Sequence, residues 1–326
     1  MMRAYLLGII LESTPWQSEW TDSPPNVTLE LVHEQMCILL EGDAVVYLVT
    51  GATGNVGSLV TEALIKRGDR PRVLVRNAEK ARARYGDRVD VFTGDLADTA
   101  SIKPALTGVH ALLLINSGHD LASRDAATAK AAKAEGLELL VKLSSYDAGE
   151  NVGTGVWHAA GESMIRATGI AFTFVQPSGF MSNALFWAGS IKNEGIVAAC
   201  TGAGKIPFIH SQDIADVVTN ALTTREYQGQ SLPITGPEAL SYAEMTEKIS
   251  AAIGSSLKFQ PISEEQVRRR MMESGEPEVE VAAHLSIYRA IRDGRLAKVT
   301  DTVERVLGRK PIRFDKWVQE NVVAFQ

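Results

Sequence analysis

The chain has few of the residues that mark disulfide frameworks and metal sites. It contains only two cysteines, Cys37 and Cys200, and they show no paired spacing. We therefore expect neither a disulfide framework nor a zinc site. The six histidines form no cluster of the His-x-x-x-His kind. A bound metal is accordingly not expected.

Basic residues and long apolar runs are also scarce. The 33 lysines and arginines are outnumbered by 39 aspartates and glutamates, giving a net charge of -6. This balance does not favour nucleic acid or an anionic membrane as a partner. No apolar run is long enough to span a bilayer. Residues 4–10 imitate a secretion signal, but Glu12, Pro15 and Trp16 stand where a small-residue cleavage site should follow, so we expect a cytoplasmic protein.

The most informative stretch covers residues 45–68, VVYLVTGATGNVGSLVTEALIKRG. An apolar run typical of a buried parallel strand is followed by three glycines and then by apolar residues at helical spacing. Gly51 permits the tight turn, Gly54 lets the backbone approach a phosphate, and Gly57 lets the helix pack against the strand. The helix N-terminus then attracts the anion, and Gly68 ends the helix. This pattern predicts a dinucleotide site; an ordinary strand-to-helix turn is the alternative.

The next strand, expected over residues 72–76, indicates which dinucleotide binds. Arg76 stands at its end, where an acidic residue would bind the ribose hydroxyls of NAD. An arginine there can pair instead with the 2'-phosphate of NADP, and Lys80 adds a second positive charge one helical turn later. The alternative is a solvated arginine at a strand end.

Further strands are expected over residues 89–92, 110–115, 137–143 and 170–175, with helices over 122–135 and 159–167 between the later ones. Six strands alternating with helices predict a doubly wound, Rossmann-like parallel sheet, which binds ligands at the carboxyl ends of its strands. Polar residues follow these ends, and Asp95 is expected to reach the adenine amino group. The residues expected at the cofactor are Gly51, Thr53, Gly54, Asn55, Val56, Gly57, Arg76, Lys80, Asp95, Leu96, Asn116, Ser117, Ser144 and Pro177.

Beyond Pro177 the pattern changes, which predicts a smaller α/β lobe for the substrate. We expect residues 45–178 to form the NADP-binding domain and residues 179–326 to form mainly the substrate lobe, with some segments returning to the sheet. An aromatic cluster opens this lobe and can wall an apolar pocket, although such clusters also occur as plain core. Its expected pocket residues are Phe180, Met181, Asn183, Phe186 and Trp187. Capping boxes are expected at Ser241 and Ser263, with a similar pattern at Asp301.

Residues 1–44 precede the first core strand and have no assigned role. They are an appended arm, an extra strand or the product of a wrongly chosen start codon, and the sequence does not separate these alternatives.

Residues 45–325 resemble the NmrA-like branch of the atypical short-chain dehydrogenase/reductase superfamily. The matching segments are VTGATGNVG, LVRNAEKA, GDLAD, KLSS, QPSGFMSN, IPFIHSQDIADV and ITGPEALSYAE. The resemblance implies an NADP-binding domain with a small C-terminal substrate lobe. It also implies either a quinone or azo-compound reductase or an NADP-sensing regulator.

The chain departs from the wider superfamily at the catalytic residues. Typical members place a tyrosine about thirteen residues after the serine that ends the fifth strand and a lysine about four residues later. Counting from Ser145 leads to His158 and Glu162, and Tyr146 likewise lacks the lysine. Without that lysine, alcohol dehydrogenation is disfavoured. A conjugated acceptor makes fewer demands, because delocalisation stabilises the anion left by hydride transfer.

The sequence therefore predicts an NADPH-dependent oxidoreductase that transfers hydride to a quinone-like or other conjugated aromatic acceptor. His158 and Tyr146 are the candidate catalytic residues, and NADP(H) is the expected cofactor. The alternative is a non-enzymatic NADP-sensing protein that acts through a protein partner. The expected partner is a small aromatic substrate, with a homodimer or a regulatory protein left open.

Overall fold

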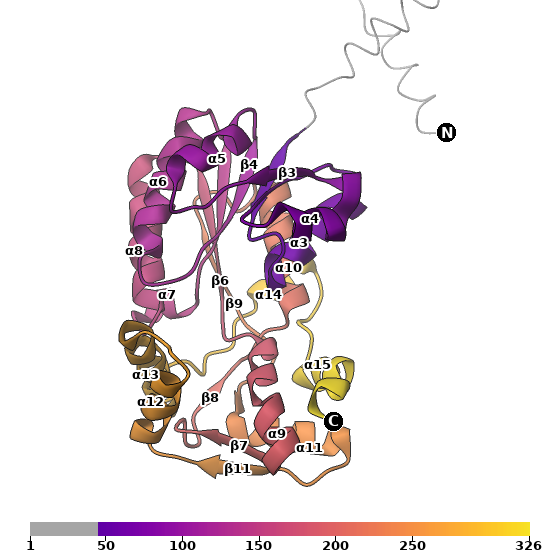
Figure 1. The fold of residues 1–326 in the computed structure, drawn as a ribbon, viewed down its shortest axis with the longest axis vertical. Helices are drawn as coiled ribbons and strands as arrows, with labels where there is room; N and C mark the ends of the chain where they lie inside the picture. The colour runs from indigo at the N-terminus through magenta and orange to yellow at the C-terminus, as the bar shows by residue number, and fades with distance from the viewer. Residues whose placement is uncertain (1–44) are drawn as a thin grey trace, which may run out of the picture. The chain divides into compact units, whose positions relative to one another are not determined.

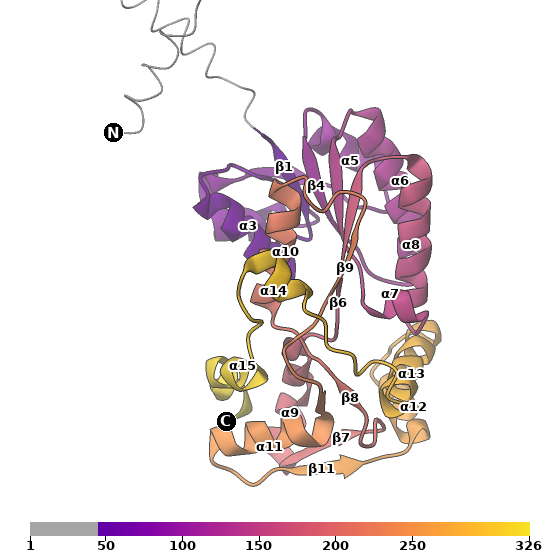
Figure 2. The same cartoon turned by 180° about the vertical axis from the view of Figure 1, so that it is seen from behind.

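The computed structural model describes residues 45–326, so the expectation for residues 1–44 lies outside the described residues. Figures 1 and 2 show a large helix-flanked sheet and a smaller lobe beyond one end of its strands. Among the described residues, no helix is both long enough and apolar enough to cross a membrane.

A seven-stranded sheet in the order β3-β2-β1-β4-β5-β6-β9 forms the centre of the large lobe. Every neighbouring pair is parallel, which confirms the doubly wound parallel sheet. The bounds are β1 Tyr47–Thr50, β2 Arg72–Val75, β3 Asp90–Thr93, β4 Ala111–Ile115, β5 Leu139–Leu143, β6 Phe172–Pro177 and β9 Ser231–Ile234. The first six strands are the expected ones, displaced by up to two residues at their ends. The seventh strand, β9, comes from beyond residue 178 and pairs with β6.

Side chains of each central strand alternate between the two faces of the sheet, as the pleat requires. Leu48, Leu112 and Leu140 lie in one core cluster, whereas their neighbours Val49 and Leu113 lie in another. Both faces are covered by helices, which is why these strands are apolar at consecutive positions.

The helices of the large lobe form one layer on each face of the sheet (Figures 1 and 2). The first layer contributes to the Val49 cluster and consists of α3 Asn55–Lys66, α4 Ala78–Tyr85, α10 Ser211–Thr223 and α14 Thr302–Leu307. The second contributes to the Leu48 cluster and consists of α5 Thr99–Leu106, α6 Leu121–Ala134 and α8 Gly155–Thr168. The short elements η1 Gly86–Arg88 and α7 Asp147–Glu150 complete this lobe. Since α10 and α14 cover the sheet, chain beyond residue 178 contributes to the core of both lobes.

The smaller lobe has two short strand pairs and its own apolar core. Strands β7 Ile196–Ala199 and β11 Lys258–Pro261 are parallel, and β8 Lys205–Ile206 and β10 Leu240–Ser241 are antiparallel. The helical elements are η2 Met181–Trp187, α9 Ala188–Glu194, α11 Tyr242–Ile253, α12 Glu264–Glu273, α13 Glu278–Arg292, α15 Phe314–Asn321 and η3 Val322–Phe325. The last two elements bury Phe314, Trp317 and Phe325 in this core, so the C-terminal end is docked.

The three expected helix starts are all present, but the expected side-chain caps are confirmed in two cases and wrong in one. Ser241 and Ser263 form capping boxes with Glu244 and Gln266. Asp301 makes no side-chain cap bond to α14. The two serines have extended backbones with ψ of 161° and 157°, whereas Asp301 has a ψ of 2°. An N-cap side chain reaches the first helical N–H groups from an extended backbone, which Asp301 lacks.

Candidate functional site

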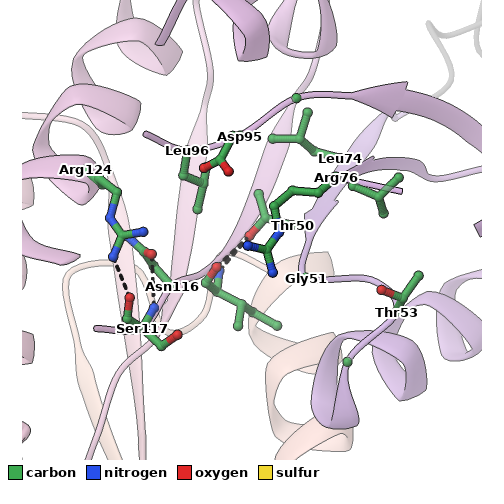
Figure 3. A pocket seen from close by; sticks show the side chains of 14 residues that line it. Thr50, Gly51, Thr53, Leu74, Arg76, Asp95, Leu96, Asn116, Ser117 and Arg124 are labelled. Carbon is green, nitrogen blue, oxygen red and sulfur yellow. Dashed lines mark hydrogen bonds between the residues drawn. The ribbon is translucent and has the colours of Figure 1, made fainter. Parts of the chain in front are cut away.

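A cavity of about 340 Å³ opens at the carboxyl ends of β1 to β4, where the strand order reverses between β1 and β4. Ligands of open α/β sheets bind at such a switch point. The lining residues are Thr50, Gly51, Thr53, Gly54, Leu74, Val75, Arg76, Gly94, Asp95, Leu96, Ile115, Asn116, Ser117 and Arg124, and Figure 3 shows their side chains. The structure thus brings together eight of the residues expected at the cofactor.

The turn from β1 into α3 forms one wall of this cavity. Gly51 has a φ of 64°, a conformation that L side chains rarely adopt, and its carbonyl accepts a hydrogen bond of 2.9 Å from the Gly54 N–H. A Cβ atom at Gly57 would lie 2.2 Å from that same carbonyl oxygen. The turn therefore requires glycine at Gly57 for close packing and at Gly51 for its backbone conformation.

The residues present fit a phosphate-bearing dinucleotide. The first turn of α3 holds no acidic residue and has no side-chain cap, so its N–H groups suit an anion. Asn55, Val56 and Gly57 form this turn without lining the cavity, and Asn55 donates a hydrogen bond of 3.0 Å to Ser182 of η2. That bond joins the cofactor turn to the smaller lobe.

Arg76 is exposed at the end of β2, and its side chain points into the cavity (Figure 3). Lys80 is exposed on α4 and does not line the cavity. Of the two positively charged residues expected at the site, the structure therefore places Arg76 there but not Lys80.

The ends of β3 and β4 supply the opposite wall. Asp95 uses one carboxylate oxygen to accept a hydrogen bond of 2.9 Å from the Ala97 N–H. Asn116 donates from Nδ2 to Oδ1 of Asp125 at 3.0 Å, and Oδ2 of Asp125 lies 2.5 Å from Nζ of Lys142. Since Asp125 and Lys142 are both fully buried, this pair fixes the orientation of Asn116.

Arg124 of α6 was not among the expected residues. Its Nη2 donates to the Ser117 carbonyl and to Oδ1 of Asp120, both at 2.5 Å, and Figure 3 shows it entering the cavity opposite Arg76. The sequence contains a signal for it, because it lies on the helix that follows β4 and so starts at the ligand edge. Arg124 was missed because the expected residues were taken only from the turn after the first strand and from positions at or near the strand ends.

A second cavity, of about 400 Å³, lies at the ends of β5 and β6 and extends into the smaller lobe. The predicted residues Phe180, Asn183, Phe186 and Trp187 line it, as do His158, Ser144 and Pro177. Ser144 and Pro177 were expected at the cofactor. The remaining lining residues are Ser145, Asp147, Thr154, Ser178, Gly179, Ile206, Phe208, Tyr242, His284, Ile287, Tyr288 and Ile291.

Two predicted residues do not line this cavity. Met181 and Tyr146 are buried in the core of the smaller lobe. Conversely, Tyr242, with its ring centroid 5.0 Å from that of Trp187, was not expected. It comes from a remote part of the chain, and its local sequence indicates only a buried helix start.

Glu162, which occupies the position of the missing lysine, is buried in a hydrogen-bonded network. Its Oε1 accepts from Ser144 Oγ at 2.6 Å and from Gln176 Nε2 at 2.8 Å. The hydroxyl proton of Ser144 is therefore directed toward Glu162, and its oxygen presents lone pairs to the cavity.

His158 and Asp147, which both line the second cavity, have shifted pKa values. Burial, with the nearby positive charge of Lys142, lowers the pKa of His158 to about 3, so this imidazole is neutral near pH 7. Burial, with the nearby Glu150, raises the pKa of Asp147 to about 6. His158 can therefore donate or accept a hydrogen bond there, but it does not act as an imidazolium.

Comparison with known proteins identifies the family. Residues 51–225 match the family of NAD(P)H-binding proteins. The chain belongs to this family.

Its relatives within the NAD(P)H-binding family include several reductases. The NAD(P)H azoreductase of Xenophilus azovorans is 34% identical over 281 residues, which cover 85% of this chain and 98% of the relative. The (4-alkanoyl-5-oxo-2,5-dihydrofuran-3-yl)methyl phosphate reductase of Streptomyces griseus is 35% identical, with coverage of 85% and 98%. The triphenylmethane reductase of Citrobacter sp., solved with NADP(H), is 26% identical with a TM-score of 0.75, covering 84% of this chain and 99% of that one.

These comparisons confirm several expectations from the sequence. They confirm the NAD(P)H cofactor, the NAD(P)H-dependent reductase class and the fold that the NmrA-like resemblance implies. The roles of the individual site residues stay predictions.

Proposed function

We propose that this protein is an NADPH-dependent reductase that transfers hydride to a quinone-like or other conjugated aromatic acceptor. The observation that carries the proposal is the second cavity, which Phe180, Phe186 and Trp187 line together with the polar residues that follow β5 and β6. An amphipathic cavity of this kind suits a flat acceptor that also carries oxygen or nitrogen. The azo and triphenylmethane groups in the names of two similar reductases are conjugated acceptors of this type.

The residues of the second cavity serve mainly to bind and orient the acceptor. NADPH, when bound, supplies the hydride. Tyr288 has a pKa raised to about 12 by burial, so it keeps its hydroxyl proton and can donate a hydrogen bond to an acceptor oxygen. His158, in its neutral form, can make a further hydrogen bond. A delocalised product anion needs no strong acid, so we expect His158→Ala to lower turnover by much less than the roughly 10²-fold to 10⁴-fold loss of a required general acid.

Steady-state oxidation of NADPH with a panel of quinones tests the proposal. The variant Phe186→Ala tests whether the quinone binds in the second cavity. Phe186 lines the cavity yet is 88% exposed, so its removal should leave the fold intact. We expect a higher KM for the quinone and an unchanged dissociation constant for NADPH. Val323→Ala, at a residue that is 76% exposed and does not line the cavity, is the matched control.

A protein that binds NADPH but reduces no quinone or azo compound would contradict the proposal. Such a result would favour the alternative, an NADP-sensing protein that acts through a protein partner.

A further inference from the structure

The two cavities differ in the charges of their lining residues. The cofactor cavity contains two arginines, Arg76 and Arg124, and one carboxylate, Asp95. The second cavity has no lysine or arginine among its described lining residues, and Asp147 is its one carboxylate. The same edge of the sheet therefore offers an anion site beside a cavity with negative character.

The other titratable groups of the second cavity do not cancel the charge of Asp147. His158 is neutral near pH 7, as its lowered pKa of about 3 requires. His284 has its Nδ1 3.4 Å from Oε2 of Glu276, so any positive charge on it faces a second carboxylate. Tyr288 and Tyr242 have pKa values raised by burial and stay uncharged.

Asp147 itself has no cationic partner among the described residues. Its backbone N–H donates a hydrogen bond of 3.3 Å to Oγ of Ser145, and this bond does not involve the carboxylate. The influences on the carboxyl are burial and Glu150, which both favour its neutral form. A cation entering the cavity would relieve this unfavourable environment, whereas an anion would worsen it.

We propose that Asp147 determines the charge preference of the acceptor, so that neutral and cationic conjugated aromatic compounds are reduced in preference to anionic ones. This inference rests on the proposed function, because it concerns the acceptor of that reaction. Asp147 is thereby a specificity-determining residue, because its carboxylate acts on the bound acceptor through its charge.

Three naphthoquinones that share one ring system test the inference: the unsubstituted compound, a sulfonate and a trimethylammonium derivative. With saturating NADPH, kcat/KM should fall in the order cation, neutral compound, anion. Two unit charges about 8 Å apart at the effective dielectric of a protein surface imply a difference of about tenfold or more between successive compounds. Equal kcat/KM values for the three compounds, or a preference for the sulfonate, would overturn the inference. This test needs only the unmodified protein.

Two variants assign the effect to Asp147. Asp147→Asn should reduce the differences between the three compounds to less than about threefold, and Asp147→Glu should retain the order, because the charge stays near the cavity. Asp87→Asn, at an exposed position on η1, is the control and should leave the ranking unchanged. If Asp147→Asn keeps the full preference, the assignment is wrong.

Binding without reduction separates this inference from the proposed function. Naphthalene sulfonate and naphthyltrimethylammonium cannot accept hydride, and their affinities for the protein with NADP⁺ bound can be measured by calorimetry. Tighter binding of the cation, lost in Asp147→Asn, supports the inference even if no quinone is reduced. Equal binding of both ions contradicts it even if quinones are reduced.

Discussion

At the scale of single residues, the surroundings give similar groups different properties. Asp125 and Asp147 are both aspartates near the ligand edge of the sheet. Asp125 lies 2.5 Å from the ammonium of Lys142 and accepts a hydrogen bond from Asn116. Asp147 has Glu150 as its charged neighbour, and burial raises its pKa to about 6. The first carboxylate therefore positions a side chain, whereas the second presents charge to a cavity.

Arg76→Ala should remove most of the preference for NADPH over NADH. The guanidinium lines the cofactor cavity at the end of β2, where it can meet the 2'-phosphate. A charge-assisted hydrogen bond contributes about 1.5 to 3 kcal/mol, so the affinity for NADPH should fall by about tenfold or more while that for NADH stays nearly constant. Calorimetric titration with both cofactors measures this. Arg82→Ala, at an exposed position on the same helix as Lys80, is the control. Equal affinities in the unmodified protein would refute the assignment.

His158 should make the protein less stable as the pH falls from 6.5 toward 3. Its pKa is lowered to about 3 in the folded state, so within this window the unfolded chain binds a proton that the folded chain does not. Between pH 7.5 and pH 5 this group should remove about 2 kcal/mol from the free energy of unfolding. Asp147 acts in the opposite direction between pH 3.8 and about 6, because its pKa is raised in the folded state.

The difference between the unmodified protein and His158→Gln isolates this effect from that of Asp147. Urea unfolding at each pH measures it, and the stability advantage of the unmodified protein over the variant should shrink as the pH falls. A difference that stays constant from pH 7.5 to pH 5 would show that His158 is not held neutral by burial.

At the scale of elements, the turn between β1 and α3 is the most tightly constrained part of the cofactor site. The Gly51 carbonyl accepts a hydrogen bond from Gly54 and lies where a side chain at Gly57 would have to be. The C-terminal end of α3 also depends on a glycine. Gly68, at a φ of 92°, donates to the Ile65 carbonyl, and Asp69 donates to that of Leu64, which together close a Schellman-type end.

Gly57→Ala should weaken cofactor binding and destabilise the fold. A Cβ atom 2.2 Å from the Gly51 oxygen cannot be accommodated by a flexible side chain, so α3 must move away from β1. Overpacking of this kind costs about 1 to 3 kcal/mol, and the affinity for NADPH should fall because the helix N-terminus is displaced. Thermal unfolding and NADPH titration check both effects.

Gly189→Ala is the matched control for this substitution. Gly189 lies in α9, and a Cβ atom there would meet nothing within 4 Å. Its replacement should be neutral or stabilise the protein by about 0.4 to 1 kcal/mol through reduced freedom of the unfolded chain. A Gly57→Ala protein as stable as the Gly189→Ala protein would contradict the close packing of α3 on β1.

At the scale of the whole molecule, the two lobes share segments and are not successive pieces of chain. Arg309 donates to Asp213 at 2.6 Å and to Asp216 at 2.5 Å, and the Ile312 N–H donates to Asp213 at 2.7 Å. These bonds attach the C-terminal segment to α10, which itself packs under the large sheet. The smaller lobe is therefore held against the large lobe by partly buried polar contacts as well as by the chain connection.

A protein that begins at Asp43 should fold and bind NADPH. Every strand of the seven-stranded sheet and every residue of both cavities lies within residues 45–326. We expect the shortened protein to keep the NADPH affinity and the melting temperature of the full chain to within a few degrees. Insolubility or loss of NADPH binding would show that residues 27–40 belong to the core.

The sequence by itself determined the parallel sheet and the cofactor turn, because both depend on local patterns. Buried parallel strands are apolar at consecutive positions, and a tight strand-to-helix turn needs glycine at Gly51 and Gly57 whatever surrounds it. The strand ends were predictable to within two residues, and so were the polar residues that follow them, such as Asp95 and Asn116.

Only the tertiary structure decided the charge and composition of the second cavity. Tyr242, His284 and Tyr288 reach it from segments more than 50 residues beyond the end of β6, so no local spacing identifies them. Met181 and Trp187 belong to the same aromatic-rich segment, yet only Trp187 lines the cavity, because the 3-10 turns of η2 direct the two side chains differently. The pKa shifts of His158 and Asp147 likewise arise from burial and neighbours that the folded chain assembles, and burial acts on a titratable group only after distant segments have enclosed it.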